Sequence, residues 1–152
     1  MPRVRAAVSV PGLASEAEAL WYDPGRWPAW VDGFGHVYKL EGEWPAPGAR
    51  AVWDSRPGGR GRVVERVSAY EARSGQTLAV EDEQLKGSQT VTFEPGPDGV
   101  ELALELEYEI KNANLFTPLT DALFIRRALR ESLQRSLDAF ARELRGDREP
   151  LA

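Results

Sequence analysis

Apolar residues alternate, mostly with glutamates, through the segment VELALELEYEI, residues 100–110. A period of two places the two kinds of residue on opposite faces of a β-strand. The apolar face comprises Val100, Leu102, Leu104, Leu106, Tyr108 and Ile110, and the other face carries Glu101, Glu105, Glu107 and Glu109. The segment therefore predicts a long strand of an antiparallel sheet that is buried on one face and solvated on the other.

A leucine-rich segment nearer the C-terminus changes to helical spacing. Thr117 is a suitable N-cap, Pro118 fits the first turn, and the helix is predicted to end at about Arg145, before Gly146. Its apolar stripe consists of Leu119, Leu123, Ile125, Leu129, Leu133, Leu137, Phe140 and Leu144. At about 1.5 Å per residue this helix is ~40 Å long, which is enough to cross a whole sheet.

The other predicted elements come earlier in the chain. Residues 4–10 alternate as a first strand, and Ser15 with Glu18 forms a capping box that predicts a short helix through Tyr22. A second short helix carries RWPAWVD and ends at Gly33. Six strands follow, at about residues 36–42, 48–55, 61–72, 76–85, 88–95 and 99–110.

This order of elements predicts an α+β protein. We expect a curved antiparallel sheet of six to seven strands wrapped around the long C-terminal helix, with two short helices after the first strand. One helix is too narrow to cover such a sheet, so a space is expected between the two layers. We predict a single domain over residues 1–146 and a C-terminal tail over residues 147–152.

The composition excludes several classes of function. The chain has 152 residues, a net charge of −5 and no cysteine, which argues against a nucleic-acid partner and excludes disulfides and thiolate sites. His36 is the sole histidine, and Glu81, Asp82 and Glu83 alternate between strand faces, so we expect no metal and no cofactor. No segment approaches the roughly twenty apolar residues of a membrane span, and none has the pattern of a signal peptide. We therefore expect a cytoplasmic protein without integral membrane association.

The segment DPGRWPAW, residues 23–30, lies between the two short helices. Together with the order of elements and the amphipathic C-terminal helix, it resembles the START-like (SRPBCC) superfamily. Within that superfamily the chain is most similar to the polyketide cyclase/dehydrase and lipid-transport group, which has the Bet v 1-like helix-grip fold. The resemblance covers about residues 3–145. It implies a deep cavity between sheet and C-terminal helix that holds hydrophobic small molecules such as lipids, quinones or polyketides.

Aromatic and apolar residues are the candidates for ligand contact in that cavity. Trp53 is favoured because two alanines share its strand face and leave room beside its ring. Trp27 and Trp30 either contact a ligand or plug the core between the short helices and the sheet. A hydroxyl such as that of Tyr108 could orient a ligand carbonyl. The predicted ligand-binding residues are Trp27, Trp30, Phe34, Trp53, Tyr108, Phe116, Leu119 and Leu123.

Arg66 and Tyr70 are the candidate catalytic residues. The segment GRVVERVSAY, residues 61–70, resembles the fourth strand of the aromatase/cyclases of this family, but Tyr70 stands where those enzymes carry an arginine that binds polyketide oxygens. Arg66 could take that role if it faces the cavity, which depends on the strand register. A two-residue turn at RSG pairs Arg66 with Glu83 on the surface, and a bulged turn pairs it with Gln84 instead.

Three classes of function stay open at this level. The first is binding or carrying of a hydrophobic small molecule. The second is a polyketide cyclase-like enzyme that stabilises an enolate with Arg66 and a tyrosine hydroxyl. The third is a protein-interaction module like the chaperone activators that share the fold, and a homodimer is possible in each class. Polar groups converging inside the cavity would favour the enzyme, whereas an entirely apolar lining would favour the carrier.

Overall fold

The computed structural model describes residues 1–111 and 119–149, and of residues 119 and 120 the backbone alone. Seven strands, two short α-helices, one 3-10 turn and one long helix follow one another along the chain. The strands are β1 (Arg3–Val10), β2 (Phe34–Glu41), β3 (Arg50–Ser55), β4 (Arg62–Glu71), β5 (Gly75–Glu81), β6 (Leu85–Gly96) and β7 (Gly99–Ile110). The helices are α1 (Ala14–Trp21), η1 (Pro24–Arg26), α2 (Trp27–Trp30) and α3 (Leu119–Arg148).

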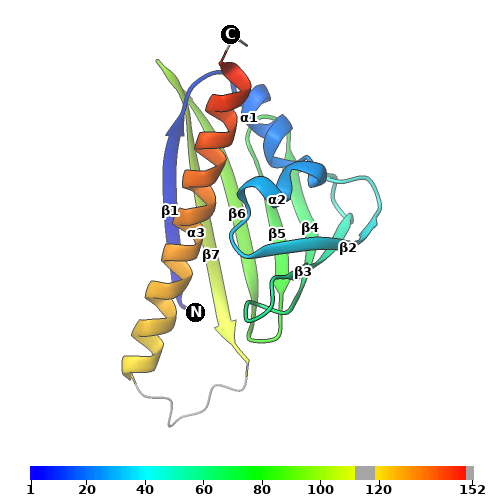
Figure 1. The fold of residues 1–152 in the computed structure, drawn as a ribbon, viewed down its shortest axis with the longest axis vertical. Coiled ribbons are helices and arrows are strands. Elements are labelled where there is room, and N and C mark those ends of the chain that lie inside the picture. The colour runs from blue at the N-terminus through cyan, green and yellow to red at the C-terminus, as the bar shows by residue number, and fades with distance from the viewer. Residues whose placement is uncertain (112–118, 150–152) are drawn as a thin grey trace.

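The strands form one antiparallel sheet in the order β1-β7-β6-β5-β4-β3-β2. Although β1 and β2 come first in the chain, they lie at opposite edges, and the segment containing α1, η1 and α2 connects one edge to the other. The sheet curves, and α3 runs along the inner face of the β1–β7 side (Figure 1). This arrangement confirms the predicted α+β helix-grip fold.

Helix α1 and the 3-10 turn η1 each begin where a carboxylate accepts a backbone N–H group. At α1 the Glu16 carboxylate accepts a hydrogen bond from the Leu13 backbone N–H at 3.0 Å, so Leu13 and not Ser15 is the N-cap. At η1 the Asp23 carboxylate accepts from the Gly25 N–H at 3.0 Å. The predicted cap at Ser15 is therefore wrong, because the N-cap lies two residues earlier, at Leu13.

Strand β7 has the predicted alternation. Its inner side chains at positions 100, 102, 104, 106 and 108 are buried. They pack with the second half of α3, where Leu137 and Phe140 have no exposed surface. The two predicted faces of strand and helix thus meet and form the main core.

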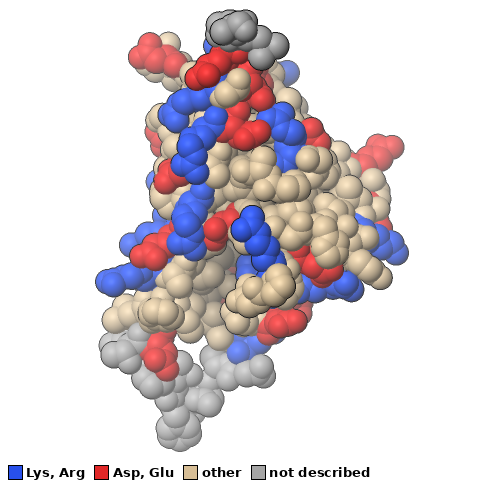
Figure 2. All heavy atoms as spheres, viewed as in Figure 1, with Lys and Arg blue, Asp and Glu red and all other residues tan. Residues whose placement is uncertain are grey.

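The first half of α3 is more exposed than its leucine pattern predicted. Leu123 keeps 56% of its surface exposed, and Phe124 keeps 73%. Basic side chains follow one another along the outward surface of α3 (Figure 2). The helix also continues past Gly146 to Arg148, into the predicted tail. Arg148 donates to the Glu16 carboxylate at 2.6 Å, and this ion pair helps to hold the last turn against α1.

Candidate functional site

A cavity of about 70 Å³ lies between the sheet, α2 and the middle of α3. This is about the volume that two molecules of liquid water occupy, whereas pockets for drug-sized ligands measure roughly 300–1,000 Å³. The walls consist of Trp21, Trp27, Trp30, Val31, Asp32, Phe34, Trp53, Arg60, Glu65, Leu78, Gln89, Leu104, Ser132, Leu133 and Ser136. A cavity that binds benzene measures about 150 Å³, so in this state a single ring would need a small outward movement of the walls, and an extended chain would need a much larger one.

Aromatic rings form much of the wall. Trp53 stacks on Phe34 with ring centres 5.0 Å apart, and Trp30 packs against Trp21 at 4.4 Å. Four of the predicted ligand-binding residues line the cavity: Trp27, Trp30, Phe34 and Trp53. The indole N–H of Trp30 is buried and has no hydrogen-bond partner among the described residues, so the wall contains an unused donor.

Glu65 brings a carboxylate into this aromatic environment. It lies on the inner face of β4, between Ala51 of β3 and Val80 of β5, and the small alanine leaves space beside it. The indole N–H of Trp53 donates to Glu65 Oε1 at 2.9 Å. Burial raises the pKa of Glu65, and this effect outweighs the lowering by the Trp53 hydrogen bond and the positive charge of Arg60.

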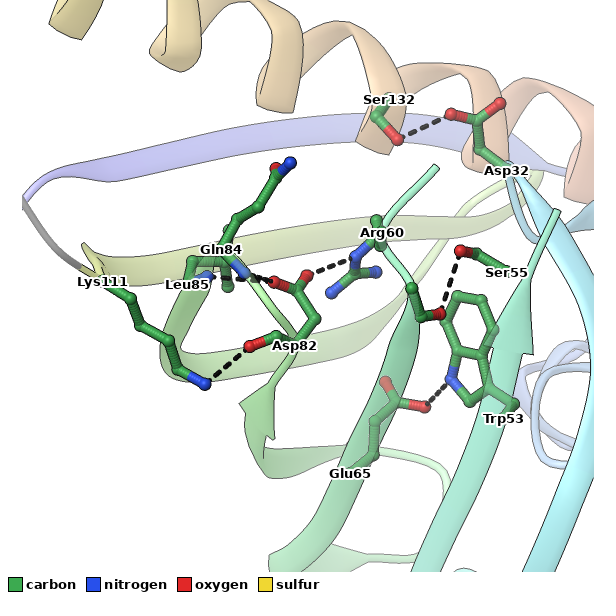
Figure 3. A network of polar contacts seen from close by, with 11 residues as sticks. Asp32, Trp53, Ser55, Arg60, Glu65, Asp82, Gln84, Leu85, Lys111 and Ser132 are labelled. Atoms are coloured by element: carbon green, nitrogen blue, oxygen red, sulfur yellow. Dashed lines mark hydrogen bonds and ion pairs between the residues drawn. The ribbon is translucent and has the colours of Figure 1, made fainter. Parts of the chain in front are cut away.

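Arg60 adds a cation from the β3–β4 loop. Its Cζ atom lies 5.5 Å from the centre of the Trp53 ring. Its Nε–H donates at 2.8 Å to Oδ2 of Asp82, a side chain that is only 2% exposed. Figure 3 shows Arg60 between Asp82 and Trp53, and it shows the Glu65 carboxylate next to the indole nitrogen of Trp53. A carboxylic acid, a guanidinium and an indole thus meet at one end of the cavity.

Asp32 connects the rim of the cavity to α3. Its carboxylate accepts hydrogen bonds from Ser132 Oγ at 2.7 Å and from Arg135 Nη2 at 3.1 Å, and its backbone N–H donates to Ser136 Oγ at 2.8 Å. Gly33, which follows, adopts a left-handed conformation with φ 72° that lets the chain turn into β2. Burial alone would raise the pKa of Asp32, but the hydrogen bonds from Arg135 and Ser132 lower it overall.

The structure does not bring the two candidate catalytic residues to the cavity. Arg66 is exposed on the outer face of β4 and pairs with Ala79, so both predicted pairings, with Glu83 and with Gln84, are wrong. The β4–β5 loop spans residues 72–74, and a bulge between positions 67 and 69 shifts the register further. Tyr70 lies apart from the cavity walls and packs edge-to-face on Tyr22.

The remaining predicted ligand-binding residues also lie away from the described cavity. Tyr108 is buried in the core but is not part of the cavity wall. Leu123 is 56% exposed although it lies about four turns before the buried Leu137 on nearly the same face of α3, so the first half of this helix is less covered than the second. Phe116 lies outside the described residues, and so does the side chain of Leu119.

Glu65 and Arg60 are the site residues that sequence reasoning missed. A signal for Glu65 was present, since a glutamate stands between Val63 and Val67 on the apolar face of an alternating strand. No comparable pattern marks Arg60. It lies in a glycine-rich loop, and only the folded chain places it beside Asp82, which is 22 residues away in sequence.

The geometry is that of a helix-grip protein with a small internal cavity that is aromatic on its walls and ionisable at one end. Residues 1–145 match the profile of the family described as polyketide cyclase / dehydrase and lipid transport, and the chain belongs to that family. Membership supports a role in binding hydrophobic ligands or in polyketide-related chemistry. No curated protein matches the sequence.

Solved structures share this fold at low sequence identity. A START superfamily protein from Mycobacterium smegmatis is 18% identical, with a TM-score of 0.74 over 95% of this chain and 97% of its own. Norcoclaurine synthase from Thalictrum, solved with a transition-state analogue, is 14% identical, with a TM-score of 0.69 over 97% and 96% of the two chains.

DynU16, a protein of the dynemicin biosynthetic locus, is 20% identical with a TM-score of 0.69. The match covers 95% of this chain but 48% of DynU16, so this chain spans about half the length of that protein. These similarities confirm the predicted START-like fold. At such low identity they do not assign a role to any residue of this chain.

Two further observations concern only the part of the chain that the structure describes. No helix there is both long and apolar enough to cross a bilayer. No group of three or more histidine, aspartate or glutamate side chains lies close enough together there to hold a metal ion. A homodimer, a cytoplasmic location and the absence of a nucleic-acid partner stay predictions.

Proposed function

We propose that this protein binds a small molecule that has an apolar ring and one oxygen able to form hydrogen bonds. The observation that carries the proposal is the cavity itself, which is lined by aromatic rings together with Glu65, Arg60 and Trp30, whose indole N–H has no partner among the described residues. A buried donor without an acceptor costs about 1–3 kcal/mol, so a ligand oxygen at that position would be favourable. The rings would contribute apolar contact, and the polar groups would set the orientation.

The cavity volume favours binding over the cyclisation of a long chain. The cavity of about 70 Å³ would have to expand to about twice its volume to hold a single ring, whereas a polyketide chain would require α3 or the rim at Asp32 to move much further outward. The polar groups that converge in the cavity favour an enzyme, but its small volume argues against cyclisation of a long chain, so we rank ligand binding first and the catalytic alternative second.

Filling the cavity tests the proposal. Leu133 of α3 lines the cavity, so Leu133→Phe should reduce its volume, while Leu123→Phe makes the same change at an exposed position of the same helix. We expect benzyl alcohol to change the tryptophan fluorescence saturably, with a Kd between about 10 μM and 1 mM given its eight heavy atoms. Leu133→Phe should weaken binding at least tenfold, and Leu123→Phe should not change it. No saturable response in the wild type, or equal affinity of the two variants, would contradict the proposal.

A second candidate function is proton transfer at carbon, as a cyclase requires. The observation that favours it is the position of Glu65 in the cavity together with its raised pKa, because a carboxyl group with a raised pKa is a stronger base than an ordinary glutamate. Glu65 would remove a proton from the carbon next to a ligand carbonyl, Arg60 would stabilise the enolate oxygen, and Glu65 would later return the proton. Exchange of the methyl protons of acetophenone in D₂O, followed by NMR, measures this step directly. Glu65→Gln should slow the protein-catalysed exchange by about 10²–10⁴-fold, and Glu105→Gln on the outer face should not.

A further inference from the structure

The guanidinium of Arg60 is fixed in place by a buried carboxylate. Asp82 accepts the Arg60 Nε–H with Oδ2, while its Oδ1 accepts the backbone N–H groups of Gln84 at 2.7 Å and Leu85 at 2.9 Å. The Asp82 carbonyl in turn accepts from Lys111 Nζ at 2.7 Å. Asp82 is therefore held by the β5–β6 turn, and it holds Arg60 in one orientation (Figure 3).

This arrangement leaves most of the donors of Arg60 unused. Only its Nε–H has an acceptor among the described residues, so both Nη groups keep their hydrogen-bonding capacity. The side chain lines the cavity, is about one third exposed, and lies over the Trp53 ring. A fixed guanidinium with free Nη groups next to an apolar wall matches a planar carboxylate, which accepts two parallel N–H groups.

We propose that the cavity selects ring compounds that carry a carboxylate, with Arg60 as the anchor and Asp82 as its positioning residue, and that their binding is coupled to protonation of Glu65. This inference rests on the proposed ligand binding and names the chemical class of the ligand. It also assigns Arg60 the anionic group and leaves the Trp30 N–H for a neutral oxygen.

The charges around Glu65 explain the coupling. Arg60 and Asp82 compensate each other at this end of the cavity, and Asp32 at the rim is compensated by Arg135. The wall groups Gln89, Ser132 and Ser136 are neutral. A ligand carboxylate at Arg60 thus adds one uncompensated negative charge close to Glu65. Because like charges in a poorly solvated site repel strongly, Glu65 takes up a proton from solvent or keeps the one it has.

The first experiment compares benzoate with benzamide, which has nearly the same size and shape but no charge. Affinities are measured by calorimetry or tryptophan fluorescence for the wild type, Arg60→Met, Asp82→Asn and Arg62→Met. Arg62 is the matched control, because it pairs with Asp54 and stacks on Tyr38 outside the cavity. We expect benzoate to bind at least tenfold more tightly than benzamide in the wild type and in Arg62→Met.

Arg60→Met should reduce the ratio of benzoate affinity to benzamide affinity to about one. Benzamide should still bind this variant, which also shows that the variant is folded. Asp82→Asn should lower the ratio to an intermediate value, because Arg60 stays but loses its fixed orientation. Equal affinity of the wild type for benzoate and benzamide would overturn the carboxylate inference and leave ligand binding intact. Binding of neither probe would overturn both.

The second experiment tests the coupling to Glu65. The Kd of benzoate is measured from about pH 6 to pH 9, where benzoate itself stays ionised. In the wild type the affinity should fall by up to tenfold per pH unit as the pH rises from the pKa of Glu65 in the free protein towards its higher pKa in the complex, and should then level off. In Glu65→Gln the benzoate affinity should be independent of pH, and benzamide should show no pH dependence in either protein. A pH-independent benzoate affinity in the wild type, or an unchanged slope in Glu65→Gln, would overturn the coupling.

Discussion

The indole N–H of Trp53 donates to Oε1 of Glu65 at 2.9 Å, so the largest side chain of β3 orients a carboxylate inside an aromatic cavity. This hydrogen bond joins the two properties of the site. The Trp53 ring supplies apolar surface against Phe34, and its nitrogen supplies one polar contact to the half-buried Glu65. The cavity therefore holds an ionisable group that is only partly exposed to solvent.

The raised pKa of Glu65 predicts a dependence of stability on pH. Below the ordinary glutamate pKa of about 4.3, Glu65 is protonated in both the folded and the unfolded chain and contributes no pH dependence. Above it, the unfolded chain loses this proton while the folded protein keeps it, so stability falls as the pH rises until the folded pKa is passed. Relative to Glu65→Gln, the wild type should lose up to about 1.4 kcal/mol per pH unit in that window. Urea unfolding of both proteins at a series of pH values measures this difference.

Glu16 provides a control of opposite sign. The Leu13 backbone N–H and Arg148 lower the pKa of Glu16, so its contribution to stability is present above the ordinary glutamate pKa and is lost as the pH falls. Comparison of the wild type with Glu16→Gln should thus favour the wild type increasingly as the pH rises. The same trend in both comparisons would show that Glu65 is not the group responsible.

The contact between Asp32 and α3 should stabilise the protein near neutral pH. Asp32→Asn removes the charge that Ser132 and Arg135 bind, and we expect a loss of about 1 kcal/mol in the free energy of unfolding, because Arg135 is largely exposed and solvent screens the pair. Since the pKa of Asp32 is lowered, this contribution should vanish as the pH falls below about 3.9 and through the folded pKa.

Removal of an exposed ion pair is the control for that measurement. Arg3 on β1 pairs with Glu105 on β7, and both side chains are well exposed. Arg3→Met should change the free energy of unfolding by less than about 0.5 kcal/mol. If Arg3→Met and Asp32→Asn lower the free energy of unfolding equally, the contact between Asp32 and α3 stabilises the protein no more than an exposed ion pair does.

Two phenylalanines of α3 test which side of the helix the core uses. Phe140 has no exposed surface and packs edge-to-face on Trp21 and Trp30 with ring centres 5.2 Å apart, so Phe140→Ala should cost about 3–5 kcal/mol. Phe124 is 73% exposed, so Phe124→Ala should change stability by no more than about 0.5 kcal/mol. Chemical denaturation of the wild type and the two variants measures both changes in the free energy of unfolding. Similar losses for both would contradict the placement of α3.

The candidate site was predictable only in part. Trp27, Trp30, Phe34 and Trp53 line the cavity as the residue types and their positions suggested. Large rings next to small residues are recognisable in a sequence because volume and polarity are local properties. Their polar partners were not recognised, since Arg60 and Asp82 come together across two loops.

The sequence by itself determined the order of elements and the buried faces of β7 and α3. Those features follow from periods of 2 and 3.6 residues, which each segment expresses without reference to the rest of the chain. Only the tertiary structure decided which side of β4 faces the cavity. A bulge between Val67 and Ala69 and the length of the following loop set that register, and a slip of one residue exchanges Glu65 with Arg66. The chemistry of the cavity therefore depends on long-range strand pairing, which no local pattern specifies.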